Sequence, residues 1–583
     1  MKKPILTGEE SFEKIIEGNY FYIDKTLFIK ELLENKGTVT LITRPRRFGK
    51  TLNMNMLQHF FDVNKDSKPL FEGLKIMEHN DIVEKHLNKY PVVSLTLKNV
   101  EFSTYEKSIE KIKSIVSSIY RQNRYLCESD RLDEQQKKDF YRYFSKEASE
   151  AELQDALLFL TECLYTYHKK RVIVLLDEYD SPIDSAYIKG YYANMVSFMR
   201  GFMGNVFKTN NYLEFGVLTG VQRISKESLI SEFNNPLVCG IMDKLFATCF
   251  GFTEDEVKEA CFMYGLSDNF EEVEKSYNGY RFGGQDIYNP WSIVGFLKVN
   301  ELKDFWANTG SMNILSDIFF KGSPALKNDI AGLLTDKPIM MKYVEHIKYP
   351  ISYKNDNIFW SMLLNAGYIK PCAGATGNRF FAELVNSEVK NALADSIEYW
   401  FDIQENQTPK VIKQFVTCLL NGDKEGVSET LNKELLNNPS CHDFKEENSY
   451  HMFIFGILLA LSNDYIVYSN PESGKGRSDC LIKPNDKEKF AVVAEFKHCS
   501  DEPVCSSTEP ECSSIENASS STKPARSTAK IKEILKKEAQ IGLKQIEDKV
   551  YIHNLKKEGY KKIYKYGIAF HKKTCVVEME ITE

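Results

Sequence analysis

The sequence feature that most constrains the fold is an apolar, β-branched run at residues 38–43 that leads into Gly49-Lys50-Thr51. A strand, a tight turn and a helix start in this order are typical of a phosphate-binding loop. We expect Lys50 to reach the β- and γ-phosphates and the Thr51 hydroxyl to hold Mg²⁺, while backbone N–H groups at the helix N-terminus cradle the anion. The usual loop begins with a glycine, and this chain has Arg44 there.

A second run, residues 171–176, has five apolar residues out of six and leads into Asp177 and Glu178. Such a run fits a central parallel strand buried on both faces, and ligands bind at the carboxyl ends of such strands. We therefore expect Asp177 to hold Mg²⁺, directly or through water, and Glu178 to polarise the attacking water. The alternative interpretation is an exposed acidic turn after a buried strand.

Further strands are predicted at residues 91–97 and 213–221, with a mostly helical insertion at 103–168 between them. Strands joined by helical crossovers predict an α/β fold with a doubly wound parallel sheet, as in a P-loop NTPase. Thr219, at the end of its strand, is a candidate sensor of the γ-phosphate, and Arg223 is a candidate for stabilising transition-state charge. The alternative is an ordinary strand end and a surface arginine.

A chain of 583 residues is too long for one hydrophobic core. We expect a P-loop domain at residues 1–252, a helical lid and winged-helix-like middle region at 253–440, and an α/β domain at 441–583. Residues 359–369 look like a helix running into a strand, as in a winged helix. For this segment we favour a packing lid over the nucleotide to a contact with DNA.

Composition excludes few partners, because the net charge is only −7. The stretch 523–573 is locally basic and either faces phosphates or forms a solvated helix surface. The start of the chain has no signal-peptide pattern, and the longest apolar run, 452–461, is too short to span a bilayer, so we expect a cytoplasmic protein without a membrane partner. The thirteen cysteines form no C-x-x-C pair, which predicts free thiols in a reducing compartment.

Near the C-terminus, Asp479 follows a glycine turn, and an apolar strand then carries Glu495 and Lys497. Period-two alternation places Glu495 and Lys497 on one face of that strand. Asp479 and Glu495 could share a divalent cation, Mg²⁺ or Mn²⁺, that stabilises a pentavalent phosphate, and Lys497 could orient or deprotonate a water. Glu-x-Lys alone is common on protein surfaces, so the alternative is a solvated strand end.

After Lys497 the sequence changes character. Residues 500–528 are rich in Ser, Pro, Glu and Thr and carry almost no large apolar side chains, which predicts a disordered insertion. We expect a helix from residue 529 to about 555 and a last strand at 565–571.

Two sets of motifs resemble known families. The segments 22–26, 44–51, 176–180 and 218–221 are similar to the bacterial AAA-ATPase-like domain family. The segments 447–451, 476–479, 495–497 and 545–546 are similar to the PD-(D/E)XK nuclease domain that usually follows it. The resemblance implies an ATP-binding P-loop domain fused to a restriction-endonuclease-like α/β domain.

The resemblance also extends to single residues. The family shares the loop Arg-Pro-Arg-Arg-x-Gly-Lys-Thr, so Arg44 is typical of it. By the same likeness, Glu447 matches the first acidic position of the nuclease core, and Gln545 matches a motif on a later helix. Two departures are the long insertion after Lys497 and Ser478, which stands where an aromatic residue is more common.

The leading hypothesis is an ATPase coupled to a Mg²⁺-dependent nuclease-like domain that acts on nucleic acid, with DNA favoured. Arg44, Arg46 and Arg47 would be additional cationic clamps on phosphate or a contact to a neighbouring domain. One alternative is an ATP-gated switch or scaffold whose degenerate nuclease domain only binds nucleic acid or protein. Another is a signalling ATPase with no nucleic acid partner. The sequence leaves self-association open.

Overall fold

The computed structural model describes residues 2–224, 236–306, 315–316, 318–319, 322–334, 336–352, 355–375, 377–405, 409–437, 465–469, 472–473, 476–499, 523–571 and 574–582. The chain divides into two compact units. The first comprises Met1–Gly322 and Pro338–Ala392, and the second comprises Ser323–Lys337 and Leu393–Glu583.

The first unit contains a five-stranded parallel sheet in the order β2-β3-β4-β1-β5. β1 (Val39–Thr43) and β3 (Val172–Asp177) are buried along their whole length, as their apolar sequences predict. The other strands are β2 (Val92–Thr96), β4 (Leu213–Gly220) and β5 (Leu237–Cys239). The predicted parallel α/β sheet is thus confirmed, although the short edge strand β5 was not expected.

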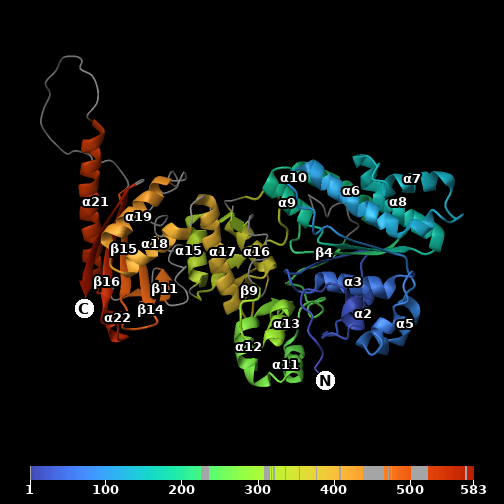
Figure 1. Ribbon diagram of the computed structural model, residues 1–583, viewed down its shortest axis with the longest axis horizontal. Helices are drawn as coiled ribbons and strands as arrows, with labels where there is room; N and C mark the ends of the chain where they lie inside the picture. Colours follow the sequence, from blue (N-terminus) through green and yellow to red (C-terminus); the bar gives the residue numbers. More distant parts are fainter. Residues whose placement is uncertain are drawn as a thin grey trace, which may run out of the picture. The chain divides into compact units, whose positions relative to one another are not determined.

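Helices cover both faces of this sheet. Figure 1 shows α6, α8, α9 and α10 on one face and α2, α3 and α5 on the other. The insertion predicted at residues 103–168 is helical, and α8 begins with a capping box in which Ser149 and Glu152 satisfy each other's backbone N–H groups. The helices are α1 (Phe12–Glu17), α2 (Leu27–Asn35), α3 (Lys50–Phe61), α4 (Lys68–Phe71), α5 (Asn80–His86), α6 (Tyr105–Gln122), α7 (Glu134–Phe144), α8 (Glu150–His168), α9 (Ser181–Lys189) and α10 (Tyr192–Phe207).

The rest of the first unit is helical, with two small antiparallel sheets, β6-β7 and β8-β10-β9. The predicted helix that runs into a strand is confirmed as α16 followed by β9. Asn289 caps α13, because its Oδ1 accepts the N–H groups of Trp291 and Ser292. The elements are α11 (Glu254–Tyr264), α12 (Phe270–Tyr277), β6 (Tyr280–Phe282), β7 (Gln285–Ile287), α13 (Pro290–Val299), β8 (Ile339–Lys342), α16 (Asp356–Ala366), β9 (Ile369–Pro371) and β10 (Arg379–Leu384).

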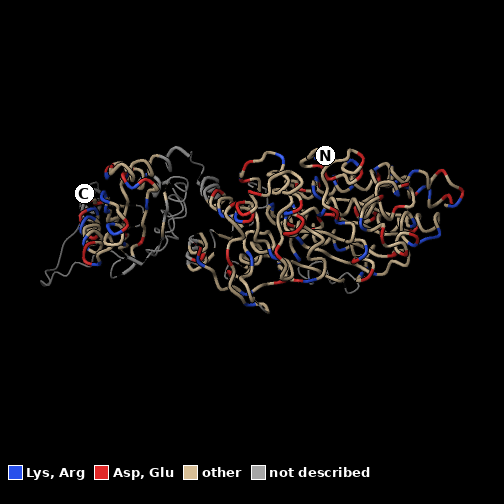
Figure 2. The backbone as a smooth tube through the Cα atoms, turned by 90° about the horizontal axis from the view of Figure 1, so that it is seen from below, with Lys and Arg blue, Asp and Glu red and all other residues tan. Residues whose placement is uncertain are grey.

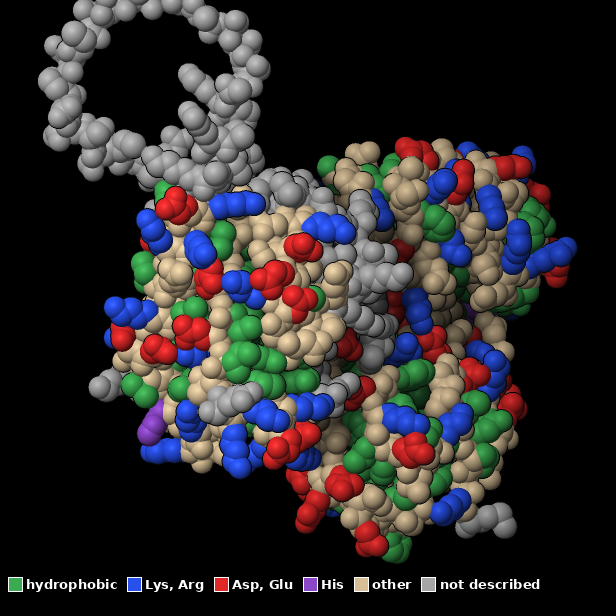
Figure 3. All heavy atoms as spheres, turned by 60° about the vertical axis from the view of Figure 1, so that its left-hand side comes forward, with side chains coloured by type: hydrophobic (Ala, Val, Ile, Leu, Met, Phe, Trp, Pro, Cys, Tyr) green, Lys and Arg blue, Asp and Glu red, His purple; other side chains and the backbone are tan. Residues whose placement is uncertain are grey.

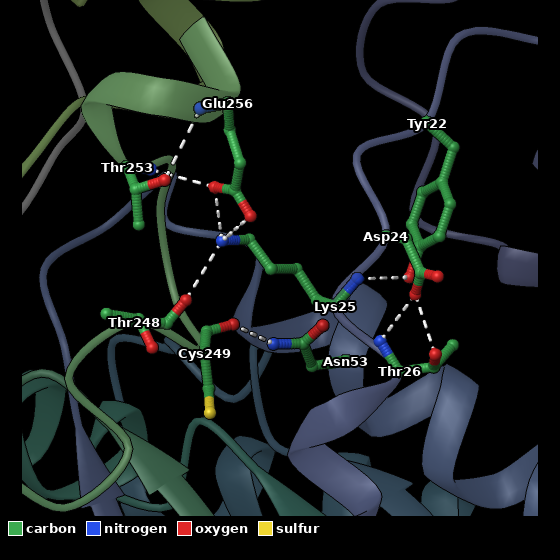
Figure 4. A network of polar contacts seen from close by, with 9 residues as sticks. All are labelled: Tyr22, Asp24, Lys25, Thr26, Asn53, Thr248, Cys249, Thr253 and Glu256. Carbon is green, nitrogen blue, oxygen red and sulfur yellow. Dashed lines mark hydrogen bonds and ion pairs between the residues drawn. The ribbon is translucent and has the colours of Figure 1, made fainter. Parts of the chain in front are cut away.

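The segment before the phosphate-binding loop is joined to α11 by a buried lysine (Figure 4). Lys25 Nζ lies 2.6 Å from Glu256 Oε2 and donates a further hydrogen bond of 2.9 Å to the carbonyl of Thr248. Burial lowers the pKa of Lys25, and the Glu256 carboxylate opposes that shift. Asp24 closes the preceding turn by accepting hydrogen bonds from the N–H and hydroxyl of Thr26. The segment therefore has a structural role beside the loop.

The second unit contains a mixed five-stranded sheet in the order β11-β14-β15-β16-β17, in which only β15 and β16 pair in parallel among the described strands. Its strands are β11 (Tyr465–Ser469), β14 (Cys480–Pro484), β15 (Ala491–His498), β16 (Ile563–His571) and β17 (Thr574–Thr582), beside a short hairpin of β12 (Glu472–Ser473) and β13 (Gly476–Arg477). Its helices are α15 (Pro324–Leu334), the latter part of α17 (Ser387–Glu405), α18 (Pro409–Leu420), α19 (Lys424–Asn437), α21 (Lys523–Asp548) and α22 (His553–Lys557).

Alternate side chains of β15 enter two different cores. Val492 and Phe496 pack with α18 and α19, whereas Ala491 and Val493 pack with α21 and α22. Glu495 and Lys497 follow the second set in alternation, so they belong to the α21 face of the sheet. This arrangement matches the predicted restriction-endonuclease-like α/β domain.

Several boundaries differ from expectation or lie outside the described residues. The helix expected over 529–555 is instead α21 and α22, because Val550 adopts a left-handed backbone conformation (φ 58°) that ends α21. Within the predicted insertion, α21 begins at Lys523, and 500–522 lie outside the described residues. The same is true of the expected boundary at residue 440, so the three-domain division stays a prediction.

Charged side chains are mixed rather than segregated. Figure 2 shows basic and acidic residues interspersed along the described chain, and Figure 3 shows the same mixing on the face it presents. Within the basic stretch 523–573, Lys565 is buried and pairs with Glu547 at 2.8 Å and Glu580 at 2.6 Å. Its charge is therefore neutralised within the fold.

Candidate functional sites

The first candidate site lies at the carboxyl end of β1. The chain leaves the buried strand at Thr43, turns, and enters α3 at Lys50. Gly49 has a φ of 78°, in the left-handed region that glycine occupies at little cost. A Cβ built there would meet nothing within 4 Å, so the backbone conformation, not lack of space, favours glycine.

Lys50 is almost fully buried, and its ammonium group is directed into the loop. Nζ donates hydrogen bonds of 3.0 Å to the carbonyl of Arg44 and 2.8 Å to that of Pro45. Burial lowers the pKa of Lys50, and the nearby carboxylates of Glu178 and Asp177 oppose this shift. The loop therefore concentrates a cation where a bound phosphate would need one.

Asp177, at the end of β3, joins the loop helix to the neighbouring strand. The Thr51 hydroxyl donates to Asp177 Oδ2 over 2.6 Å, and the Thr219 hydroxyl donates to Oδ1. β4 lies between β1 and β3, so the register of the parallel strands brings these three residues together. Hydroxyl and carboxylate oxygens are the ligands that Mg²⁺ prefers, so Thr51 and Asp177 fit that ion.

Glu178 follows Asp177 in a left-handed conformation, with φ at 53°. Burial raises the pKa of its carboxyl group, while Lys50 lowers it. Its Oε2 accepts a hydrogen bond of 3.3 Å from Ser181. A raised pKa suits a carboxylate that accepts a proton near neutral pH.

The three loop arginines have different environments. The Arg44 guanidinium is fully buried and donates to the carbonyls of Thr43, Cys239, Gly240, Leu245 and Phe246. Burial lowers its pKa to about 10. This placement differs from the expected phosphate clamp, because the side chain is bound to the chain that follows β4.

Arg47 and Arg46 lie nearer the surface. Arg47 is exposed, and its guanidinium carbon is 4.1 Å from the centroid of the Trp291 ring, a cation–π contact with α13. Arg46 is half-buried. Its charge adds to the effect of burial in lowering the pKa of Lys50, and it opposes the effect of burial, which raises the pKa of Glu178. Of the three, Arg46 therefore lies within electrostatic reach of the lysine and carboxylate of the loop.

Arg223 does not join this cluster through any described contact. Its guanidinium forms an ion pair with Glu345, and its carbonyl accepts the N–H of Ile347 over 3.0 Å. These contacts connect the end of β4 with the segment after β8.

The second candidate site lies on the α21 face of the C-terminal sheet. Lys497 Nζ lies 3.2 Å from Glu495 Oε1, and Gln545 Nε2 donates to the same oxygen. Asp479 precedes β14, and its Oδ2 accepts the backbone N–H of Phe496 over 2.7 Å. The structure thus brings together four of the predicted residues, Asp479, Glu495, Lys497 and Gln545.

One oxygen of this second site has no hydrogen-bond partner. Glu495 is only 2% exposed, and its buried Oε2 has no hydrogen-bond partner among the described residues. Burial and the nearby Asp479 raise the pKa of Glu495 to about 7, and Lys497 opposes them. A buried carboxylate oxygen without a partner fits a divalent cation, which would supply the missing contact.

Two glycines bring the helix to this site, and sequence reasoning missed both. Gly567 is the register partner of Glu495 on β16, and a Cβ there would lie 1.9 Å from the carbonyl oxygen of Ala539 in α21. Gly542, on α21, lies opposite Gly567, where a Cβ would be in ordinary van der Waals contact, 3.4 Å from the Gly567 Cα. The close approach places Gln545, one turn later, against Glu495. Tyr551, whose hydroxyl accepts from Gln545 over 3.4 Å, also lies beside this site.

The remaining predicted residue of this site, Glu447, lies outside the described residues. Within the described ranges every cysteine is a free thiol, and no group of three or more His, Cys, Asp and Glu side chains is arranged to hold a metal. Among the described residues, the second site therefore has two acidic side chains, Asp479 and Glu495.

Comparison with protein families gives one match over each of the two candidate sites. Residues 6–230 match the family described as "Predicted AAA-ATPase", and residues 445–535 match the "PD-(D/E)XK nuclease superfamily". The chain carries an AAA-ATPase-like domain followed by a PD-(D/E)XK nuclease-superfamily domain. The AAA-ATPase-like match contains the loop and Asp177, and the nuclease-superfamily match contains Asp479, Glu495 and Lys497. Gln545 lies beyond the matched segment.

A curated relative is a protein of Azotobacter chroococcum mcd 1 described as "Uncharacterized protein in vnfD 5'region". It is 28% identical over 336 residues, which cover 57% of this chain and 59% of the relative. The chain therefore spans less than two thirds of that relative. No helix in the described ranges has the length and apolar character needed to cross a membrane.

Proposed function

We propose that the AAA-ATPase-like domain binds and hydrolyses ATP, and that the nuclease-superfamily domain cuts nucleic acid phosphodiesters, with DNA favoured. The ATPase proposal rests on the convergence of Thr51, Asp177 and Thr219 beside Lys50. The second half rests on the unpaired Glu495 oxygen beside Asp479 and Lys497.

In the proposed ATPase site, Lys50 binds phosphate oxygens and Glu178 accepts a proton from the attacking water. Thr51 and Asp177 would hold Mg²⁺, which would supply electrostatic stabilisation of the charge that develops on the phosphoryl group. Thr219 holds the second oxygen of Asp177 and so fixes the carboxylate between two strands. Arg46 adds positive charge near the loop, and the backbone N–H groups at the start of α3 face the anion.

In the proposed nuclease site, Asp479 and Glu495 would hold Mg²⁺ or Mn²⁺, which would stabilise the pentavalent phosphate and lower the pKa of water. Lys497, held 3.2 Å from Glu495, orients or deprotonates the attacking water. Gln545 holds Glu495 from α21 and restricts its rotation. Glu447 completes the acidic set in this proposal.

The deciding experiment incubates the purified chain with Mg²⁺ and mixed DNA and RNA, with and without ATP, and measures both phosphate release and fragments. Lys50→Ala should abolish phosphate release, and unchanged release would refute the ATPase assignment. Fragments that disappear when Glu495 is changed to Gln would support the nuclease. Binding without any fragments would instead support a nucleotide-gated scaffold.

We also propose the three-part organisation with boundaries near residues 252 and 440, and a cytoplasmic location. The free thiols of the described cysteines support a reducing compartment. Limited proteolysis of the purified chain would test the boundaries, since cleavage concentrates in exposed connections between folded domains.

A further inference from the structure

An exposed apolar and cationic surface lies on the antiparallel strands β8 and β10, in the first unit. The strand register pairs Met340 with Phe381 and Lys342 with Arg379. Met340 is 57% exposed and Phe381 is 52% exposed, and both cations are also exposed. Because directly paired residues point to the same face, these four side chains form one surface, here called the ribbon face.

The opposite face of the same strands is fully used by the core. It carries the buried side chains of Ile339, Met341, Phe380 and Ala382. This alternation fixes the register, because a slip of one residue would place Lys342 and Arg379 in the core. The exposure of Phe381 and Met340 is therefore a property of the fold and not of a loosely held strand.

The charge of the ribbon face is not neutralised locally. Among the described residues, no ion pair or hydrogen bond joins the Lys342 or Arg379 side chain to a carboxylate. The acidic residue of this face, Glu383, lies 3.6 Å from Lys370 of β9 and is compensated by it. An apolar pair is thus followed on the same two strands by two free cations.

We propose that the ribbon face binds single-stranded nucleic acid. Phe381 stacks on an unpaired base with Met340 against its edge, and Lys342 and Arg379 contact the neighbouring phosphates. A nucleic acid single strand presents flat bases and anionic phosphates in alternation. These groups complement the exposed apolar pair and the two cations of the ribbon face better than an acidic or a purely apolar protein surface does. The inference rests on the proposed nuclease function and names the form of its substrate, a nucleic acid with an unpaired stretch.

The test uses the full chain carrying Glu495→Gln, so that binding is measured without cleavage. Fluorescence anisotropy of a labelled DNA single strand, the same strand as RNA, and a DNA duplex is recorded over a range of salt concentrations. Adding Phe381→Ala should weaken single-strand binding about tenfold and leave duplex binding unchanged, because paired bases are not free to stack. Adding Lys342→Ala with Arg379→Ala should reduce the salt slope by about 1.4, which is the release expected for two phosphate contacts on a single strand.

Phe262→Ala is the matched control, because Phe262 is 77% exposed on α11 and does not belong to the ribbon face. It should leave every binding curve unchanged. A loss restricted to DNA or to RNA would support the proposal and identify the sugar. Single-strand binding that is unaffected by the ribbon variants would overturn this inference alone. No binding of any nucleic acid by the Glu495→Gln chain would overturn both it and the nuclease proposal. If the ribbon variants lower only the thermal unfolding midpoint, the face is an internal packing surface and the inference is wrong.

Discussion

The hydroxyl of Thr51 donates a 2.6 Å hydrogen bond to Oδ2 of Asp177, which joins the first turn of α3 to the end of β3. The two residues are 126 positions apart in the chain. In the sheet, β4 lies between β3, which ends at Asp177, and β1, which leads into the loop before Thr51. Thr219 of β4 donates to the other oxygen, so the carboxylate is held from both sides. A change at any of these three residues should therefore affect the same chemical step.

Thr51→Val keeps the shape of the side chain and removes its hydroxyl. We expect ATP hydrolysis to fall by about 100-fold or more, because the group proposed to hold Mg²⁺ beside Asp177 is lost. Thr51→Ser keeps the hydroxyl and should retain most of the activity. Steady-state phosphate release at several Mg²⁺ concentrations measures both variants, and equal rates for Val and Ser would contradict the role of the hydroxyl.

Arg44 and Arg46 should respond to substitution in opposite ways. Arg44→Ala leaves several buried carbonyls without donors and should reduce the free energy of unfolding by on the order of 3 kcal/mol. Arg46→Ala should act mainly on nucleotide binding and raise the KM for ATP, because Arg46 lies near the loop charges. Urea unfolding and ATPase kinetics distinguish these outcomes. A stable Arg44→Ala protein with a raised KM would instead restore Arg44 as a phosphate clamp.

Asp479→Asn and Glu495→Gln should each reduce metal-dependent cutting of DNA by about 100-fold or more, since each removes a negative charge from the proposed cation site. Asp548→Asn, at the end of α21, is the control and should cut normally. Agarose gels of plasmid nicking measure activity, and the thermal shift caused by Mn²⁺ measures binding independently of cleavage. Cutting that persists in both site variants would show that the reaction takes place elsewhere.

Glu388 should make the stability of the chain depend on pH. Its side chain is buried, accepts hydrogen bonds from Ser292 (2.8 Å) and the Trp306 N–H (2.7 Å), and has its pKa raised by burial to about 7. The folded chain therefore holds a proton that the unfolded chain releases near pH 4.5, so the stability from this proton is present below pH 4.5 and is lost as the pH rises to about 7.

Glu388→Gln mimics the protonated side chain and can still accept the Trp306 N–H through its amide oxygen. Relative to the unchanged chain, we expect the variant to gain on the order of 3 kcal/mol of stability on going from pH 4.5 to pH 8. Thermal unfolding midpoints at pH 5 and pH 8 measure the difference. A variant whose relative midpoint is the same at both values would show that Glu388 is not titrating in this range.

Sequence reasoning reached the first site because its determinants are local. Apolar runs predict β1, β3 and β4, and parallel strands place their carboxyl ends at one edge of a sheet, so Thr51, Asp177 and Thr219 could be expected to meet there. The partners of Arg44 could not be predicted in this way, because they are backbone carbonyls at residues 239–246 that carry no sequence signal. The same holds for Arg223, whose acidic partner, Glu345, is 122 residues away.

In the nuclease-superfamily domain, alternation along β15 was enough to place Glu495 and Lys497 together. The contact with Gln545 depended on a likeness to known motifs, and its physical cause was not visible in the sequence pattern. That cause is the closeness of α21 to β16 at Gly542 and Gly567. A glycine in a strand indicates a bulge or a close approach, but it does not name the helix that approaches.

The buried guanidinium of Arg44 has a consequence for how such a loop could change over time. The position that a conventional phosphate-binding loop leaves without a side chain is here filled by a long cation with five carbonyl partners. Exchange of Arg44 for glycine would leave these buried carbonyls without donors, which costs stability. We therefore expect a glycine-first loop transplanted into this chain to be less stable than the native loop, unless the segment that receives the arginine is exchanged with it.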